Sequence, residues 1–432
     1  MLNKRKRMAL LGLLFLFCVL LIPGCAERDE PEQVEITLVH GWGGTLNTHK
    51  TMQAVYDEFS EENPDIRLIC IPYSDSSIAV QRANDMLAVG KMPDIVSTNG
   101  LSYYMNHAVK RDKAMDLMPY LERDKAFKNM IHPSVFESWE TGNGHLYTVP
   151  DALEVAGYWY NREYMKAAGI VDEAGEIAEP KTWEEFLDMA RKLKAWTEKV
   201  DEDISVCSLE QLQMLEFLFP ARLAGEGAQG LALLSKATVA FDRETLAPVM
   251  RDLGVLEGLS KPVENIESAR QDFNDGKSVL YFNGIWESNA LTEENGQEDI
   301  GYSAYPFDGT RQLAYISASS GYVVAKQKNE KKSEACIRFL KYMLSEEVQR
   351  KLAVSTGQMP SNPNVDWEKV RKENPVLAGA IDKMYEAEIP INMIRTVWTE
   401  EKVDIVGKYM EAGEFDAESA GRMAEELNRK GK

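Results

Sequence analysis

The chain has 432 residues, of which 49 are basic and 69 acidic, so its formal net charge is −20. A content of 44% hydrophobic and 27% charged residues is typical of a folded protein and excludes wholesale disorder. The acidic excess argues against a nucleic-acid-binding protein, and five cysteines are too few for a small fold held together by disulfides. The length predicts two lobes rather than a single hydrophobic core.

Residues 1–24 have the layout of a secretory signal peptide. Four basic residues at positions 4–7 precede an apolar run over 8–22, which at about 15 residues is short for a membrane-spanning helix of about 20. No later stretch is long and apolar enough to span a membrane. The segment therefore predicts export of the protein.

The signal peptide ends in the sequence Leu21-Ile22-Pro23-Gly24-Cys25, which resembles a bacterial lipobox. The resemblance implies that Cys25 is acylated, for example by palmitate, and becomes the first mature residue. We expect residues 25–33, which are rich in charge, to form a tether to the cell membrane, with the protein anchored at its extracytoplasmic face. The alternative is a signal peptide that ends near a cysteine by chance.

The first part of the mature chain alternates strands and helices, the pattern of a parallel sheet with helical crossovers. Ligands bind beyond the carboxyl ends of such strands, so the loops that begin at Gly41 and Thr98 are the first candidates for function. The predicted elements are the strands Val34–His40, Ile66–Ile71 and Asp94–Ser97, a helix with Met52, Val55, Tyr56 and Phe59 on one face, and a helix over Ile78–Val89.

Further elements follow in chain order. They are an extended stretch at Gly144–Asn161 with a break at Pro150, a helix that Thr182 and Glu185 begin as a capping box, a strand at Val279–Phe282, strands at Gly301–Pro306 and Leu313–Ala325 joined by the turn Asp308-Gly309, a helix at Ser333–Leu344, and a helical tail from Asp366.

Catalytic and metal-binding motifs are missing from the sequence. It contains no HExxH, GxSxG or P-loop motif, and the five histidines are scattered without the spacing of zinc ligands. Acidic residues are abundant, but no pair is singled out as catalytic. We therefore expect no enzyme activity, no metal and no cofactor.

Tryptophans stand at positions that suit a ligand. Trp42 follows the first strand, Trp286 follows the strand Val279–Phe282, and Trp398 lies in the helical tail. An indole ring beside water offers a flat apolar face for the CH-rich face of a sugar ring, while nearby amides and carboxylates take its hydroxyl groups. The alternative for each tryptophan is a place in the core, which we predict for Trp159, Trp183 and Trp196.

Three segments in this order resemble the bacterial ABC-transporter extracellular solute-binding proteins of the sugar-binding family 1 type. They are Gly144–Asn161 leading into Pro180–Phe186, Phe273–Glu287, and Ser320–Leu352. The resemblance implies an α/β protein of the two-lobe, type II periplasmic-binding-protein-like fold, with a ligand cleft between the lobes. It places the crossings near Pro150, Asp299 and Gly357, which gives an N-terminal lobe of residues 34–150 plus 301–357 and a C-terminal lobe of 151–300 plus 358–432.

The same resemblance implies ligand-binding residues. Trp286 matches a sugar-stacking aromatic residue, Glu154 a carboxylate of the cleft, and Trp398 a C-terminal stacking residue. Asn99 occupies a further ligand-contacting loop, although Ser97–Gly100 lacks the aromatic and charged residues of the maltodextrin-binding members. Asp151 and Tyr315 are weaker candidates, because an aspartate after proline often serves a turn and a strand tyrosine often packs.

These observations predict a monomeric, lipid-anchored binding protein that captures a mono- or oligosaccharide by lobe closure and delivers it to ABC permease subunits. No nucleic-acid partner is expected. One alternative keeps the transport role but takes a non-sugar solute such as a polyamine, which a cleft with unpaired carboxylates and few aromatic residues would favour. A glycosidase or a carbohydrate adhesin at the cell surface is a more distant alternative.

Overall fold

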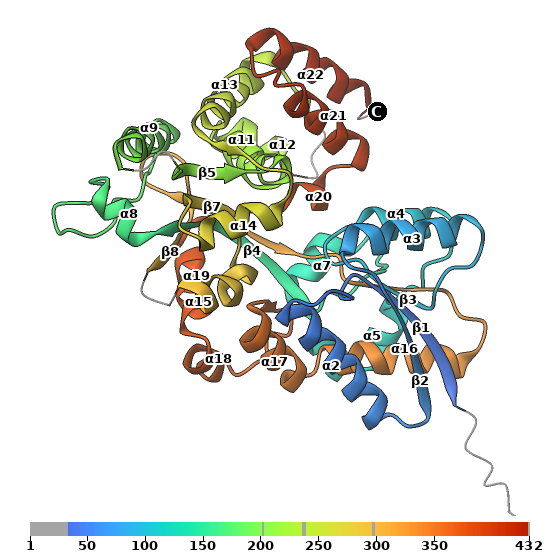
Figure 1. The fold of residues 1–432 in the computed structure, drawn as a ribbon. Helices are drawn as coiled ribbons and strands as arrows, with labels where there is room; N and C mark the ends of the chain where they lie inside the picture. Colours follow the sequence, from blue (N-terminus) through green and yellow to red (C-terminus); the bar gives the residue numbers. More distant parts are fainter. Residues whose placement is uncertain (1–32, 201–202, 236–238, 296–298, 431–432) are drawn as a thin grey trace, which may run out of the picture.

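The computed structural model describes residues 33–200, 203–235, 239–295 and 299–430. They form two β-sheets with helices packed on each (Figure 1). The predicted signal peptide, Cys25 and nearly all of the tether lie outside the described residues. Within the described ranges, no helix is long and apolar enough to cross a membrane.

The smaller sheet has four strands in the order β11-β3-β1-β2 and is the centre of the N-terminal lobe. β1 pairs in parallel with β2 and β3, and β11 is antiparallel to β3. The strands are β1 (Val34–His40), β2 (Ile66–Pro72), β3 (Ile95–Ser97) and β11 (Tyr322–Val324), and the helices of this lobe are α2 (Asn47–Glu62), α3 (Ser76–Ala88), α4 (Tyr103–Lys110), α5 (Met118–Arg123), α6 (Lys125–Asn129), α7 (Pro133–Trp139), α16 (Glu330–Met343) and α17 (Glu346–Thr356).

The larger sheet has nine strands in the described chain and is the centre of the C-terminal lobe. Its strands are β4 (Ala152–Asn161), β5 (Ser205–Leu209), β6 (Lys261–Pro262), β7 (Ser278–Gly284), β8 (Ile300–Ser303), β9 (Tyr305–Pro306), β10 (Gln312–Ala318), β12 (Met359–Pro360) and β13 (Ile389–Ile391). β4 is the longest strand and pairs with β7, β8, β10 and β12 along its length.

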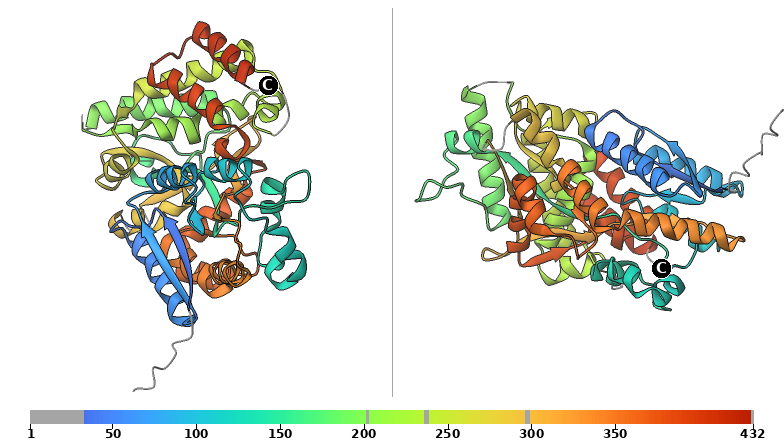
Figure 2. Two further views of the ribbon diagram at one scale, coloured as in Figure 1. Left: turned by 90° about the vertical axis from the view of Figure 1, so that its right-hand side faces the viewer. Right: turned by 90° about the horizontal axis from the view of Figure 1, so that it is seen from below.

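The helices of the C-terminal lobe surround this sheet (Figure 2). They are α8 (Arg162–Ala167), α9 (Trp183–Val200), α10 (Gln211–Gln213), the π-helix η1 (Met214–Leu218), α11 (Phe219–Ala224), α12 (Ala228–Leu233), α13 (Arg243–Leu259), α14 (Ile266–Asn274), the 3-10 helix η2 (Ile285–Glu287), α15 (Ser288–Asn295), α18 (Trp367–Glu373), α19 (Pro375–Glu386), α20 (Ile394–Val397), α21 (Glu400–Glu411) and α22 (Ala417–Lys430).

The larger sheet is buried on both faces. Successive side chains of a strand point to opposite faces, so Tyr158 of β4 joins the hydrophobic core under α9 and α13 while Trp159 joins a second core under α19. All seven residues of β7 are buried for the same reason. Burial on both faces explains why the sequences of these strands are nearly continuous runs of apolar residues rather than alternating apolar and polar ones.

Several sequence predictions are confirmed. β1 has the predicted bounds, and the buried face of α2 consists of the four predicted residues. The capping box at the start of α9 is present, since the amide of Glu185 donates to Thr182 Oγ1 at 3.1 Å and the amide of Thr182 donates to Glu185 Oε2 at 3.2 Å.

The expected crossing near Asp299 is wrong. Residues 300–318 pair with the larger sheet through β8, β9 and β10, so they belong to the C-terminal lobe rather than to the N-terminal one. The stretch predicted as one strand from Leu313 to Ala325 is two strands, β10 and β11, which belong to different sheets. The chain changes sheet at Ser319–Gly321, where Gly321 packs so closely on Pro150 that a Cβ atom would lie 2.2 Å from its Cα.

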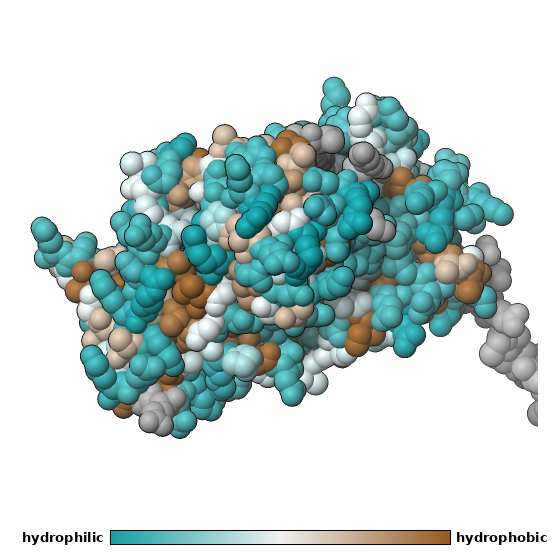
Figure 3. All heavy atoms as spheres, turned by 90° about the horizontal axis from the view of Figure 1, so that it is seen from above, coloured by the Kyte–Doolittle hydropathy of each residue, from teal (hydrophilic) through white to brown (hydrophobic). Residues whose placement is uncertain are grey.

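One face of the molecule carries mainly hydrophilic side chains, with hydrophobic residues in separate small groups (Figure 3). This distribution agrees with the acidic, well-solvated surface that the net charge of −20 indicates.

Candidate functional site

A cleft of about 610 Å³ lies between the two lobes. Its N-terminal wall comes from the loop after β1, the start of α2 and Asn99. Its C-terminal wall comes from α14, η2, α15 and η1, and the crossing segments 151–154 and 355–358 line its base. Of the seven predicted ligand-binding residues, five line this cleft: Trp42, Asn99, Asp151, Glu154 and Trp286.

Trp286 is held at the end of β7 by its neighbours. Its ring folds back over Gly284, where a Cβ atom would lie 2.1 Å from the nearest ring carbon, so only glycine leaves room for this orientation. The ring of Phe217 lies behind it at a centroid distance of 6.3 Å. The indole of Trp286 is therefore half-buried, with part of its surface free to contact a ligand in the cleft.

Trp42 lies in the opposite wall and is 7% exposed. The loop that carries it packs tightly, because a Cβ atom on Gly41 would lie 2.4 Å from the amide nitrogen of Ser76. The ring of Trp42 meets that of His49 edge-on at 5.6 Å. Its indole Nε1 is buried and has no hydrogen-bond partner among the described residues. An unpaired donor in a cleft wall is what an oxygen-rich ligand can satisfy.

Two carboxylates come from the segment that joins the lobes at the start of β4. Asp151 accepts a hydrogen bond from the hydroxyl of Tyr322 at 2.7 Å, and burial raises the pKa of Asp151. Burial, with a smaller contribution from the nearby Glu216, raises the pKa of Glu154 to about 8, although Arg395 opposes this shift. The carboxyl of Glu154 rests against Gly100, where a Cβ atom would lie 2.4 Å from Oε1.

Sequence reasoning missed the charged residues of the C-terminal wall. Glu216 on η1 pairs with Arg395. On α14, Arg270 pairs with Glu267 at 2.6 Å and with Glu287 at 3.4 Å. Glu216 and Arg395 are far apart in the chain, so no local motif marks their pair. Arg270 and Glu267 are three residues apart on α14, but such a pair is common on exposed helices and does not by itself indicate a ligand site.

Asn99 lies at the end of β3 and lines the cleft, with a backbone φ of +44° that asparagine tolerates better than most residues. Its side-chain amide donates to Ser76 Oγ at 2.8 Å. Asn99 therefore shapes the wall, and its amide already has a partner within the N-terminal lobe.

Tyr315 and Trp398 do not reach the cleft, so the predictions for these two residues are wrong. Tyr315 is fully buried, and its hydroxyl donates to the carbonyl of Phe217 at 2.6 Å. Trp398 packs edge-on against Phe219 and Phe241, and its indole donates to the carbonyl of Leu233 at 2.8 Å. Both are core residues whose polar groups are satisfied by backbone carbonyls.

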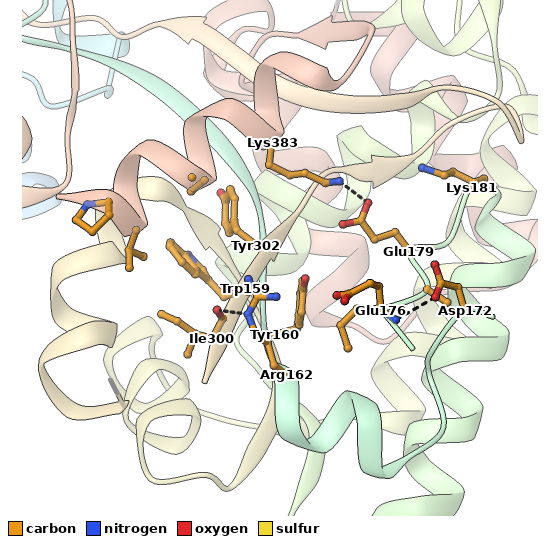
Figure 4. Close-up of a pocket in the computed structure, with 17 residues that line it drawn as sticks. Trp159, Tyr160, Arg162, Asp172, Glu176, Glu179, Lys181, Ile300, Tyr302 and Lys383 are labelled. Carbon is orange, nitrogen blue, oxygen red and sulfur yellow. Dashed lines mark hydrogen bonds and ion pairs between the residues drawn. The ribbon is translucent and has the colours of Figure 1, made fainter. Parts of the chain in front are cut away.

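A larger hollow of about 920 Å³ lies on the C-terminal lobe, away from the cleft (Figure 4). The rings of Trp159 and Tyr160 in its wall are almost fully buried. Three of its charged groups are engaged within the protein, since Lys383 pairs with Glu179 at 2.9 Å and Arg162 donates to the carbonyl of Ile300 at 2.8 Å. The hollow thus offers no exposed aromatic face, and we place the candidate site in the cleft.

The described residues contain no group of three or more His, Cys, Asp or Glu side chains placed to hold a metal ion. The three cysteines in these ranges, Cys70, Cys207 and Cys336, are free, and burial raises the pKa of each thiol. These thiols are therefore poor nucleophiles at neutral pH.

The sequence matches one protein family over most of its length. Residues 54–379 match the family described as bacterial extracellular solute-binding protein. The chain belongs to this family. The solute-binding protein is therefore an extracellular binding protein rather than an enzyme, as its lack of catalytic motifs led us to expect.

Two relatives of the solute-binding protein are similar over most of their own length. The multiple sugar-binding protein of Streptococcus mutans is 21% identical over 360 residues, covering 80% of each chain. The putative ABC transporter periplasmic-binding protein YcjN of Escherichia coli is 22% identical over 393 residues, covering 86% of this chain and 83% of its own.

Solved structures share the fold. A Streptococcus pneumoniae solute-binding protein in complex with the blood group A-trisaccharide superposes with a TM-score of 0.75 at 21% identity, covering 91% of this chain and all of that one. At this identity the likeness establishes the two-lobe fold of the solute-binding protein, as predicted from the resemblance.

Proposed function

We propose that this protein is the substrate-binding component of an ABC importer and that it captures a mono- or oligosaccharide in the cleft between its lobes. The observation that carries the proposal is the half-buried indole of Trp286, which lines the cleft across from the more deeply buried Trp42. An indole face suits the apolar face of a sugar ring, and the carboxylates and amides around it suit the hydroxyl groups.

The names of similar proteins support the same class of ligand. The Streptococcus mutans relative is called a multiple sugar-binding protein, and the Streptococcus pneumoniae structure holds a trisaccharide. The Escherichia coli relative is called an ABC transporter protein, which supports a permease as the partner.

Capture would proceed by closure of the lobes. Ser102 at the start of α4 donates to the carbonyl of Arg395 at 2.9 Å, and His107 of α4 lies 3.8 Å from Glu400 of α21, so the two lobes already touch beside the cleft. A saccharide that contacts both Trp42 and Trp286 favours the closed arrangement, because only that arrangement allows both contacts at once. The permease then receives the closed, loaded form.

The proposal includes a lipid anchor at Cys25 on the extracytoplasmic face of the cell membrane. An anchored receptor stays near its permease, and the tether raises the effective concentration of the loaded form there.

A titration calorimetry panel tests the saccharide claim. The panel contains neutral mono- and oligosaccharides, a polyamine and a short peptide, each titrated into the wild-type protein and into Trp286→Ala. We expect binding of at least one saccharide and a loss of affinity of about tenfold in Trp286→Ala, since stacking against an indole contributes roughly 1.4 kcal/mol.

Trp367→Ala is the matched control, because Trp367 is also partly buried but packs on the core under α19, outside the cleft. This variant should keep the wild-type affinity. Binding of the polyamine or the peptide with no response to any saccharide would overturn the proposal.

A further inference from the structure

The walls of the cleft carry more negative than positive side chains. Arg395 contacts Glu216, and Arg270 is shared by Glu267 and Glu287. Among the described residues, no cationic side chain forms an ion pair with Asp151 or Glu154, although Arg395, which is paired with Glu216, lies near enough to oppose the rise in the pKa of Glu154. The carboxylate of Asp151 accepts a hydrogen bond from the Tyr322 hydroxyl. The five carboxylates of the lining are Asp151, Glu154, Glu216, Glu267 and Glu287, and the two guanidinium groups compensate only part of their charge.

A second observation concerns unpaired polar atoms in residues that line the cleft. The indole Nε1 of Trp42, the ring Nδ1 of His49 and the amide Oε1 of Gln358 are buried, and none has a hydrogen-bond partner among the described residues. All three residues line the cleft. Since buried polar groups are normally paired, a ligand that reached these atoms would gain hydrogen bonds by supplying donors and acceptors of its own.

The position of Glu154 sets the charge that such a ligand should carry. Its carboxyl is wedged against Gly100 at the base of the cleft, close enough to Glu216 for the two charges to repel. Burial and this repulsion raise the pKa of Glu154 to about 8, so the empty cleft holds a proton there at neutral pH. A positive group on the ligand would replace that proton, which leaves as the carboxylate pairs with the ligand.

We propose that the ligand is a saccharide that carries a protonated amine; this inference rests on the proposed function. The amine would lie against Glu154 and Asp151, and a sugar ring would lie against Trp286. A free polyamine explains the carboxylates but leaves the indole face of Trp286 and the unpaired indole donor of Trp42 without a role. A neutral saccharide explains the indoles but leaves Asp151 and Glu154 without a cationic partner.

The test compares matched probes by titration calorimetry at pH 5.5, at which the amine of a glucosamine unit is already protonated in solution and Glu154 still carries its proton. The probes are a glucosamine oligosaccharide, its fully N-acetylated counterpart and a neutral glucose oligosaccharide of the same length. We expect the amine-bearing probe to bind at least tenfold more tightly than either of the others. Titration in two buffers of different ionisation enthalpy should show release of a proton on binding of the amine-bearing probe only.

The variant Glu154→Gln should remove both the preference for the amine and the proton release, because its side chain cannot ionise. Glu163→Gln is the matched control, since Glu163 is exposed on α8 and lies outside the cleft. If Glu154→Gln does not fold, as judged by thermal unfolding, the number of protons that the wild-type protein releases on binding the amine-bearing probe decides whether Glu154 pairs with the amine.

The possible results separate this inference from the proposed function. Equal affinity for the amine-bearing and N-acetylated probes, without proton release, would overturn the inference and leave saccharide binding intact. Binding of spermidine with no saccharide bound would overturn both.

Discussion

At the scale of single residues, the cleft depends on side chains whose neighbours decide their orientation. Trp286 reaches the cleft because Gly284 leaves space for its ring. Trp398, which has the same chemistry, is enclosed by Phe219 and Phe241 and donates to a backbone carbonyl. Whether a tryptophan can contact a ligand therefore depends on the space around its ring and on whether its indole N–H already has a partner.

Gly284→Ala should lower saccharide affinity about tenfold, because the added methyl group would displace the ring of Trp286 from its position. Titration calorimetry measures this loss. Gly258→Ala on α13 is the control, since a Cβ atom there meets nothing within 4 Å, and it should leave the affinity unchanged. Wild-type affinity in Gly284→Ala would show that the ring orientation does not matter for binding.

Glu154 should make the stability of the empty protein depend on pH. Its pKa is about 8 in the folded protein and near 4.5 in the unfolded chain, so the folded form binds the extra proton between these values. The free energy of unfolding therefore falls as pH rises from about 4.5 to 8, by roughly 4 kcal/mol at most. Below pH 4.5 the carboxyl is neutral in both states and contributes nothing.

The variant Glu154→Gln isolates this effect. Its advantage in stability over the wild type should be near zero at pH 4.5 and should grow toward pH 8, as followed by urea denaturation. His40, whose pKa burial lowers to about 4, destabilises both proteins equally as pH falls below about 6.5, so its contribution cancels in the difference. A difference that does not change with pH would contradict the assignment of the raised pKa.

At the scale of elements, caps fix where helices begin. α9 begins at a capping box and buries Trp183 and Phe186 in the core of the C-terminal lobe, far from the cleft lining. Its contribution should therefore be to stability alone.

Thr182→Ala removes the hydroxyl that accepts the amide of Glu185 and should lower the free energy of unfolding by about 1 kcal/mol. Chemical denaturation measures this change, and titration calorimetry should show unchanged affinity. Thr182→Ser keeps the acceptor and should retain most of the stability. Equal losses in the two variants would show that the cap hydroxyl is not the cause.

The elements also show what a sequence can reveal. Local patterns, such as the apolar face of α2 and the capping box of α9, are complete within one or two turns and were predicted correctly. The change of sheet at Ser319–Gly321 was missed, because β10 and β11 are equally apolar and only long-range pairing separates them. The ion pairs of Arg270 with Glu287 and of Arg395 with Glu216 were missed for the same reason, since only the fold brings the partners of each pair together.

At the scale of the whole molecule, two lobes enclose one cleft, and the three crossings of the chain meet at its base. The crossings are near Pro150, at Ser319–Gly321 and near Gly357. Hydrogen bonds connect these crossings. Ser361 Oγ donates to the carbonyl of Pro150 at 2.6 Å, and the amide of Gly321 donates to Thr148 Oγ1 at 2.8 Å. The proposed closure would therefore turn about these crossings.

The proposed anchor belongs to the same scale. In cells, Cys25→Ser should move the protein from the membrane fraction to the soluble fraction without changing saccharide affinity, because the residues that line the cleft begin at Trp42, after the predicted tether. Fractionation followed by immunoblotting measures the distribution. Retention of the variant in the membrane fraction would contradict anchoring through this cysteine.

The central claim is that a saccharide binds between the lobes against Trp286 and Trp42. A crystal structure of the protein with a saccharide found by the calorimetry panel tests it most directly. We predict a sugar ring against the indole of Trp286, polar contacts to Glu154, and Trp42 on the opposite side of the ligand. A saccharide bound in the hollow near Lys383, with the cleft empty, would contradict this account.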